Sequence, residues 1–105
     1  MKGGRSEIAI TVITGFELLK GYRTKKEETA VNELFSRVRI HHLDGKSMRV
    51  SGNLYRELKN RGRLKNETDV PIAGIVLAKN ETLITVDSDF SILEDAMGDR
   101  LILLE

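Results

Sequence analysis

The spacing of apolar residues divides the first half of the chain into short apolar runs and amphipathic segments. Residues 7–14 are rich in β-branched side chains, which is typical of a strand, and they lead into a short helix that Gly21 ends. Residues 25–38 carry apolar side chains at three- and four-residue steps, which predicts an amphipathic helix. Residues 39–44 then predict a short strand that ends at an Asp-Gly break.

The second half of the chain repeats this alternation. A helix is predicted from about Lys46 to Arg61, and its expected apolar side consists of Met48, Val50, Leu54, Tyr55 and Leu58. A second, broadly buried helix opens at Thr68-Asp69 with Pro71 in its first turn, where a missing N–H does little harm. The remaining predicted elements are a strand at Thr82–Val86, a short helix at about Ile92–Ala96 and a strand at Leu101–Leu104.

The predicted order, βααβααβαβ, favours an α/β fold. Strands separated by helices imply parallel pairing with helices on both faces, and strands that are apolar without alternation fit such a buried sheet. A length of 105 residues suits one domain, so we predict a single α/β domain over residues 1–105, built on a doubly wound parallel sheet flanked by helices.

Composition narrows the functional classes only slightly. Seventeen Lys and Arg against 16 Asp and Glu give a net charge of +1, which neither requires nor excludes a polyanionic partner. The absence of cysteine excludes disulfides, thiolate metal sites and a cysteine nucleophile. Because no apolar run approaches the ~18 residues of a membrane span and the first residues lack a signal-peptide core, we predict a cytoplasmic protein without membrane contact.

Four acidic residues stand where parallel α/β sheets collect their functional sites, at the carboxyl ends of strands. Glu17 follows the first strand, with Thr14 as the predicted N-cap of a capping box that would place Glu17 in the first helical turn. Asp87 and Asp89 follow the strand at Thr82–Val86, and Asp69 opens the helix before that strand. Each acid alone also fits an ordinary cap or turn, whereas converging carboxylates suit Mg²⁺ or Mn²⁺.

Three stretches carrying these acids together resemble the PIN domains, most closely the VapC-like toxin endonucleases of prokaryotic toxin–antitoxin pairs. Ile8-Ala-Ile-Thr-Val-Ile-Thr-Gly-Phe-Glu-Leu-Leu-Lys-Gly21 is similar to the family's strand leading to "T-x-x-E-L-x-x-G". Asp69-Val-Pro-Ile-Ala-Gly-Ile-Val-Leu-Ala78 is similar to its "D-x-x-I-A-x-x-A" helix, and residues 82–90 are similar to its "L-V-T-x-D-x-D-F" stretch. The resemblance extends from about Ser6 to Leu104.

The resemblance implies a metal-dependent endoribonuclease. It places Glu17, Asp69 and Asp87 on the second, third and fourth acidic positions of the family, Asp89 as an auxiliary ligand or structural acid, and Thr85 as the site hydroxyl. The implied cofactor is Mg²⁺ or Mn²⁺, the implied substrate is RNA, and the implied protein partner is an antitoxin. The paired helices of residues 17–38 also lead us to expect a homodimer.

One part of the family pattern is missing from this sequence. The family begins with a strand whose "L-D-T/S" motif carries the first metal-binding Asp, and residues 1–5 are too short to form it. The expected domain is therefore incomplete at its N-terminus, where the missing strand would lie between the strands at residues 8–12 and 82–86. Three arrangements are open: these two strands pair directly, another chain supplies the strand, or the sequence is a piece of a longer one.

Two other functions compete with an active nuclease. One is a catalytically impaired PIN-like module that acts by association, and the other is an unrelated doubly wound domain whose acids are caps. A basic cluster at the end of the long helix is read as a solvated surface in preference to an RNA contact. Its residues are Arg56, Lys59, Arg61, Arg63 and Lys65.

Overall fold

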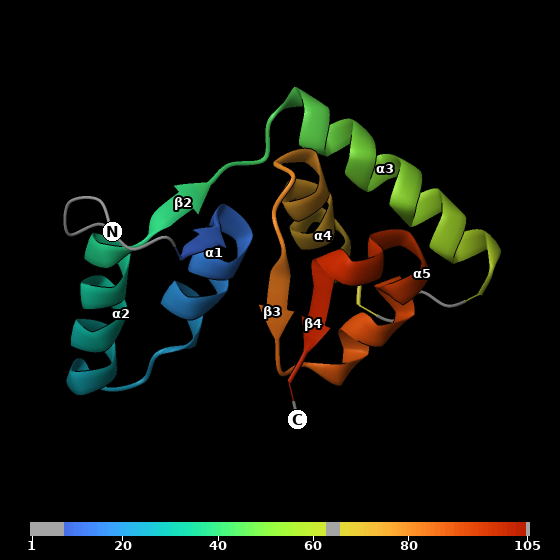
Figure 1. Cartoon of the computed structure of the whole chain (residues 1–105). Coiled ribbons are helices and arrows are strands. Elements are labelled where there is room, and N and C mark those ends of the chain that lie inside the picture. Colours follow the sequence, from blue (N-terminus) through green and yellow to red (C-terminus); the bar gives the residue numbers. More distant parts are fainter. Residues whose placement is uncertain (1–7, 63–65, 105) are drawn as a thin grey trace. The chain divides into compact units, whose positions relative to one another are not determined.

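A computed structural model describes residues 8–62 and 66–104 (Figure 1). Their contacts divide the chain into two compact units, Met1–His42 and Leu43–Glu105. Unit 1 contains β1 (Ala9–Thr11), α1 (Val12–Gly21), α2 (Lys25–Arg37) and β2 (Arg39–His41). Unit 2 contains α3 (Gly45–Asn60), α4 (Asp69–Ala78), β3 (Leu83–Thr85), the 3₁₀ turns η1 (Ser88–Leu93) and η2 (Gly98–Arg100), α5 (Glu94–Met97) and β4 (Leu101–Leu103).

The strands pair in parallel, as predicted. In unit 1, β1 lies beside β2 with Ile10 opposite Ile40, and in unit 2, β3 lies beside β4 with Ile84 opposite Ile102. Within the described residues, each unit thus contains its own two-stranded parallel sheet.

The first helix begins earlier than the sequence pattern suggested. The N-cap of α1 is Thr11, whose hydroxyl accepts a hydrogen bond from the Thr14 N–H at 3.0 Å. The predicted N-cap, Thr14, is thus inside the helix, and the expectation that Glu17 lies in the first turn is wrong. The reason is that both threonines fit the N-cap pattern, and the three-residue strand β1 ends before the β-branched run does.

Unit 1 packs its short helices through a small contact surface. Gly15 is buried, and an added Cβ there would lie 3.7 Å from the Phe35 ring of α2. Thr24 caps α2 by accepting the Glu27 N–H at 3.1 Å, and Val38, the residue directly after α2, is buried. Most other large apolar side chains of this unit stay exposed.

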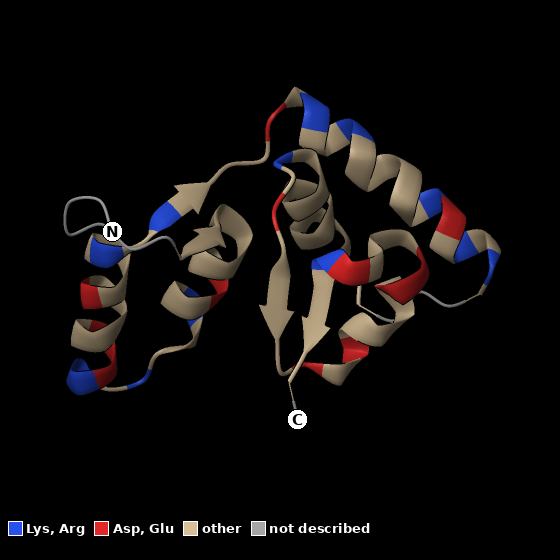
Figure 2. Cartoon of the chain, viewed as in Figure 1, with Lys and Arg blue, Asp and Glu red and all other residues tan. Residues whose placement is uncertain are grey.

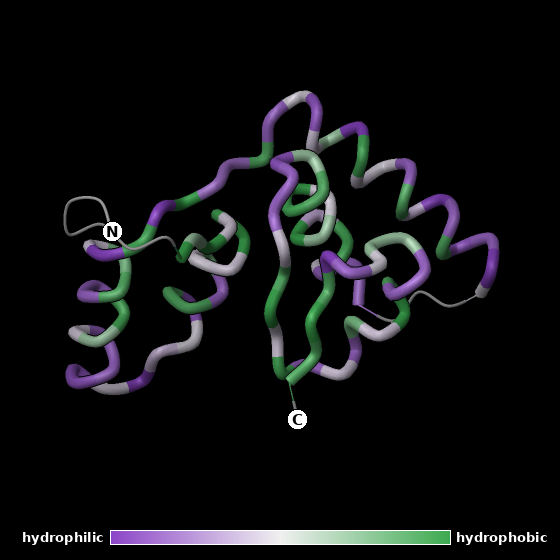
Figure 3. The backbone as a smooth tube through the Cα atoms, in the orientation of Figure 1, coloured by the Kyte–Doolittle hydropathy of each residue, from purple (hydrophilic) through white to green (hydrophobic). Residues whose placement is uncertain are grey.

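Unit 2 has its core between α3 and α4, with α4 apolar along its length (Figure 3). Val70, Ile75 and Leu93 are almost completely buried, and Phe90 of η1 is also buried. The predicted apolar side of α3 is correct for Leu54 and Leu58 but wrong for Met48, which is exposed. In this first turn of α3 the buried side chain is that of the neighbouring Ser47, a small residue that fits because α3 and α4 approach closely.

A capping box fixes the start of α3. Asp44 accepts the Ser47 N–H at 2.9 Å while the Ser47 hydroxyl accepts the Asp44 N–H at 2.8 Å, and Lys79 at the end of α4 donates to the Asp44 carboxylate at 2.9 Å. These hydrogen bonds, the one from the Ser47 backbone first, hold the pKa of Asp44 well below its usual range. Asp44 therefore ties the start of α3 to the end of α4.

We expect Asp44→Ala to lower the urea midpoint of unfolding at pH 7, whereas Asp44→Asn keeps the cap and loses only the charge. The folded pKa lies below the unfolded value of about 3.9, so the charge stabilises the fold above pH ~4 and its contribution is lost as pH falls below that. The Asn variant should thus be less stable than wild type at pH 7, and the difference between the two should be clearly smaller at about pH 2.5. Equal differences at both pH values would contradict this role of the charge.

Among residues 8–62 and 66–104, no helix has the length and apolar character required to cross a bilayer.

Candidate active site

The carboxyl end of β3 carries three predicted site residues in one hydrogen-bonded turn. The Thr85 hydroxyl accepts the Asp87 N–H at 3.0 Å, and the Asp87 carboxylate in turn accepts the Asp89 N–H at 2.9 Å. The Thr85 carbonyl accepts the Leu104 N–H at 2.8 Å, which anchors the end of the strand. Thr85 therefore positions the loop, while Asp87 and Asp89 are exposed with carboxylate oxygens available to a ligand.

The third acid of unit 2 has a different environment. Asp69 is the first residue of α4 and only 4% exposed, whereas Asp87 and Asp89 are exposed. A helix N-terminus favours negative charge because its N–H groups and dipole point toward it. Burial of a carboxylate is costly. A buried Asp at the start of an otherwise apolar helix therefore indicates that its polar group has a role there.

Glu17 lies in unit 1, half-buried in the second turn of α1. Across the described ranges, no three His, Asp or Glu side chains form a group able to hold a metal ion. The donors fit Mg²⁺ or Mn²⁺ in kind, because both ions prefer carboxylate oxygens and Mg²⁺ retains several waters. The residues therefore match these ions in the type of donor atom alone. The assignment of Glu17, Asp69, Asp87 and Asp89 as ligands stays a prediction.

Comparisons with known proteins identify the fold. No family profile matches this chain. Over 77 residues it is 32% identical to Ribonuclease VapC1 from Methanocaldococcus jannaschii, a match that covers 73% of this chain and 57% of that protein. The chain thus spans little more than half of that relative's length.

Solved structures of the VapBC type share the architecture. A chain of VapBC-5 from Mycobacterium tuberculosis, a member of the VapBC family of toxin–antitoxin systems, superposes with a TM-score of 0.76 at 24% identity, covering 90% of this chain and 79% of that one. For VapBC-1 from nontypeable Haemophilus influenzae the TM-score is 0.75 at 25% identity, and the match covers 93% of this chain and 73% of that one. For VapBC2 from Rickettsia felis, bound to a DNA fragment from its promoter, the TM-score is 0.71 at 26% identity, and the match covers 92% of this chain and 73% of that one.

These likenesses place the chain among the α/β domains of PIN type. More particularly, it is a VapC-like PIN domain by fold. The predicted fold class and family resemblance are therefore confirmed, and the reading as an unrelated doubly wound domain is wrong.

Proposed function

We propose that this protein is a metal-dependent endoribonuclease of the VapC-like class, acting in the cytoplasm as the toxin of a toxin–antitoxin pair. The 77-residue likeness to a protein named as a ribonuclease carries the proposal. The turn after β3 and the buried Asp69 support it, because both carry carboxylates, the donors that Mg²⁺ and Mn²⁺ prefer. The VapBC structures support an antitoxin as the protein partner.

In this proposal Asp69 and Asp87 hold Mg²⁺ or Mn²⁺, with Glu17 and Asp89 as further ligands. When bound, such an ion would supply an activated water and would offset the charge that develops on the scissile phosphate. The chain's own part is to orient the carboxylates. The Asp89 N–H occupies one oxygen of Asp87 and so fixes the direction of the other, and Thr85 fixes the Asp87 backbone.

The proposal is tested by incubating the pure protein with single-stranded RNA in Mg²⁺, Mn²⁺ or EDTA. We expect internal cleavage with either ion and none in EDTA, together with saturable metal binding by calorimetry. Absence of cleavage with both ions would overturn the nuclease. Absence of metal binding as well would favour the impaired interaction module.

Exposed apolar residues of α1 support the proposed homodimer. Phe16 is 61% exposed and lines an apolar pocket of about 210 Å³ together with Val12, Gly15, Leu19, Phe35 and Ile40. An exposed apolar surface of this kind is typical of an association site. We expect Phe16→Ser to shift the protein from dimer to monomer in analytical ultracentrifugation, with Ile84→Ser, an exposed residue of unit 2, as the control. A monomeric wild type would contradict the dimer.

A further inference from the structure

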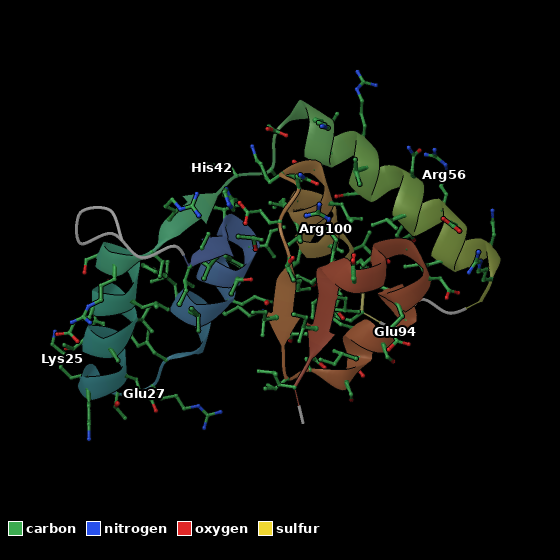
Figure 4. All side chains as sticks on the ribbon, viewed as in Figure 1. Lys25, Glu27, His42, Arg56, Glu94 and Arg100 are labelled. Atoms are coloured by element: carbon green, nitrogen blue, oxygen red, sulfur yellow. The ribbon has the colours of Figure 1, made fainter. Side chains whose placement is uncertain are left out.

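The outer face of α3 is cationic over the length of the helix. Its inner face buries Ser47, Leu54 and Leu58. At alternating three- and four-residue steps on the outer face stand five exposed polar residues, which we call the cationic stripe: Lys46, Arg49, Asn53, Arg56 and Asn60. This spacing places them on one side of the helix. Figure 2 shows the basic residues along α3, and Figure 4 shows Arg56 extending away from it.

Negative charge near the stripe is engaged elsewhere. Glu57 is the only acid within α3 and pairs with Arg61 at 2.9 Å, while Asp44 just before the helix pairs with Lys79. Lys46 and Arg49 form no ion pair with another described residue of unit 2. The stripe therefore presents cations that no carboxylate in the described part of unit 2 neutralises.

The basic cluster predicted from sequence proximity is a different group. Arg61 is used in ion pairs with Glu57 and with Asp95, the latter at 3.4 Å, and Lys59 lies over the Tyr55 ring at 5.8 Å. Arg63 and Lys65 lie outside the described residues. Arg56 is the member shared with the stripe, where it donates to the Asn53 side chain. That bond orients two donors of the stripe together.

We infer that the cationic stripe binds the sugar–phosphate backbone of single-stranded RNA, an inference that rests on the proposed ribonuclease function. Lys, Arg and Asn donate readily to phosphate and sugar oxygens. From Lys46 to Asn60 the helix rises about 21 Å, which matches roughly six stacked nucleotides at ~3.4 Å each. The stripe offers no exposed aromatic ring for base stacking, so the contact is independent of sequence.

The position of the stripe defines its part in the reaction. It faces away from α4, whose first residue is Asp69, because α3 buries its opposite side against that helix. The stripe therefore holds RNA that flanks the cleaved bond. Its loss should raise KM for long RNA, while kcat and the cleavage of RNA shorter than about six nucleotides stay unchanged.

The test is the double variant Arg49→Gln/Arg56→Gln, with Arg23→Gln/Lys26→Gln in unit 1 as a control that removes the same charge from exposed positions. Binding of a fluorescent 30-nucleotide RNA is followed by anisotropy in EDTA on an Asp87→Asn background, so that no cleavage intervenes. Loss of two phosphate contacts should weaken binding about 25-fold at 0.1 M salt and reduce the log–log salt slope by about 1.4. Circular dichroism checks that both variants fold.

Equal weakening by both double variants, or none by Arg49→Gln/Arg56→Gln, would overturn the inference. A loss confined to duplex DNA, with RNA binding intact, would overturn it as well and assign the stripe to DNA. The cleavage assay keeps the two proposals apart. If the protein binds RNA through the stripe but does not cleave it, only the nuclease proposal fails. If cleavage of long RNA needs Asp87 but its KM is unchanged by loss of the stripe, only the stripe inference fails.

Discussion

Asp87→Asn should reduce the RNA-cleavage rate at least ~100-fold in saturating Mn²⁺, because removal of a charged ligand weakens the metal site and its stabilisation of charge in the transition state. The substitution keeps the shape of the side chain and an oxygen that accepts the Asp89 N–H, which is 2.9 Å from the carboxylate in the wild type. Folding should therefore be unaffected. The measurement is initial rate on a defined RNA, combined with a calorimetric Mn²⁺ titration.

The matched control is Asp99→Asn, which removes the same charge from an exposed position of η2 in the same unit. It should cleave RNA and bind Mn²⁺ as the wild type does. If Asp87→Asn and Asp99→Asn had equal activity, Asp87 would not belong to the catalytic machinery. Asp69→Asn tests the proposed metal-binding role of the buried Asp69 in the same way.

Gly74→Ala should destabilise the fold by about 3 kcal/mol, or roughly 12 °C or more in Tm. A Cβ at this position would lie 1.9 Å from Ser51 Oγ and 3.0 Å from Ser51 Cα, so the α3 backbone itself obstructs the methyl group. The helices must separate to accept it, which loosens the packing around Ile75 and Leu54. Thermal unfolding followed by circular dichroism measures the effect.

Gly52→Ala is the matched control for this substitution. Gly52 lies on α3, and the atom nearest to an added Cβ is Arg56 Nη1 at 3.9 Å, an ordinary contact. The better helix propensity of Ala should stabilise the protein by about 0.5–1 kcal/mol.

Ser51→Gly combined with Gly74→Ala should recover part of the stability lost in Gly74→Ala, since it removes the obstructing hydroxyl. A Gly74→Ala variant as stable as wild type would show that α3 and α4 are not closely packed.

Helix periodicity allowed most of the fold to be predicted. The helix predicted for residues 25–38 is α2 (Lys25–Arg37), and the one predicted from Lys46 to Arg61 is α3 (Gly45–Asn60). The strands proved shorter than their apolar runs, because pairing with a neighbour and not local propensity decides where a strand ends. The start of α1 was missed since Thr11 and Thr14 fit the cap pattern equally well.

The family motifs predicted Asp69 and Asp87 as site residues, and this assignment stays a prediction. The difference in their burial depends on tertiary packing that no spacing reveals. The cationic stripe was overlooked for a simpler reason. Neighbours in sequence, such as Arg61, suggested a cluster at the helix end, while the three- and four-residue steps from Lys46 to Arg56 mark the actual outer face.

The positions of the paired strands along the chain also set the order in which the two sheets can form during synthesis. β1 and β2 are complete once residue 41 has left the ribosome, so the first sheet can form early and from a short segment. β3 must wait for its partner until residues 101–103 emerge, and the apolar helix α4 is synthesised well before then. Nascent chains therefore pass through a stage in which α3 alone covers the apolar helix α4 and its remaining apolar surface is exposed, the stage at which chaperone binding or aggregation would occur.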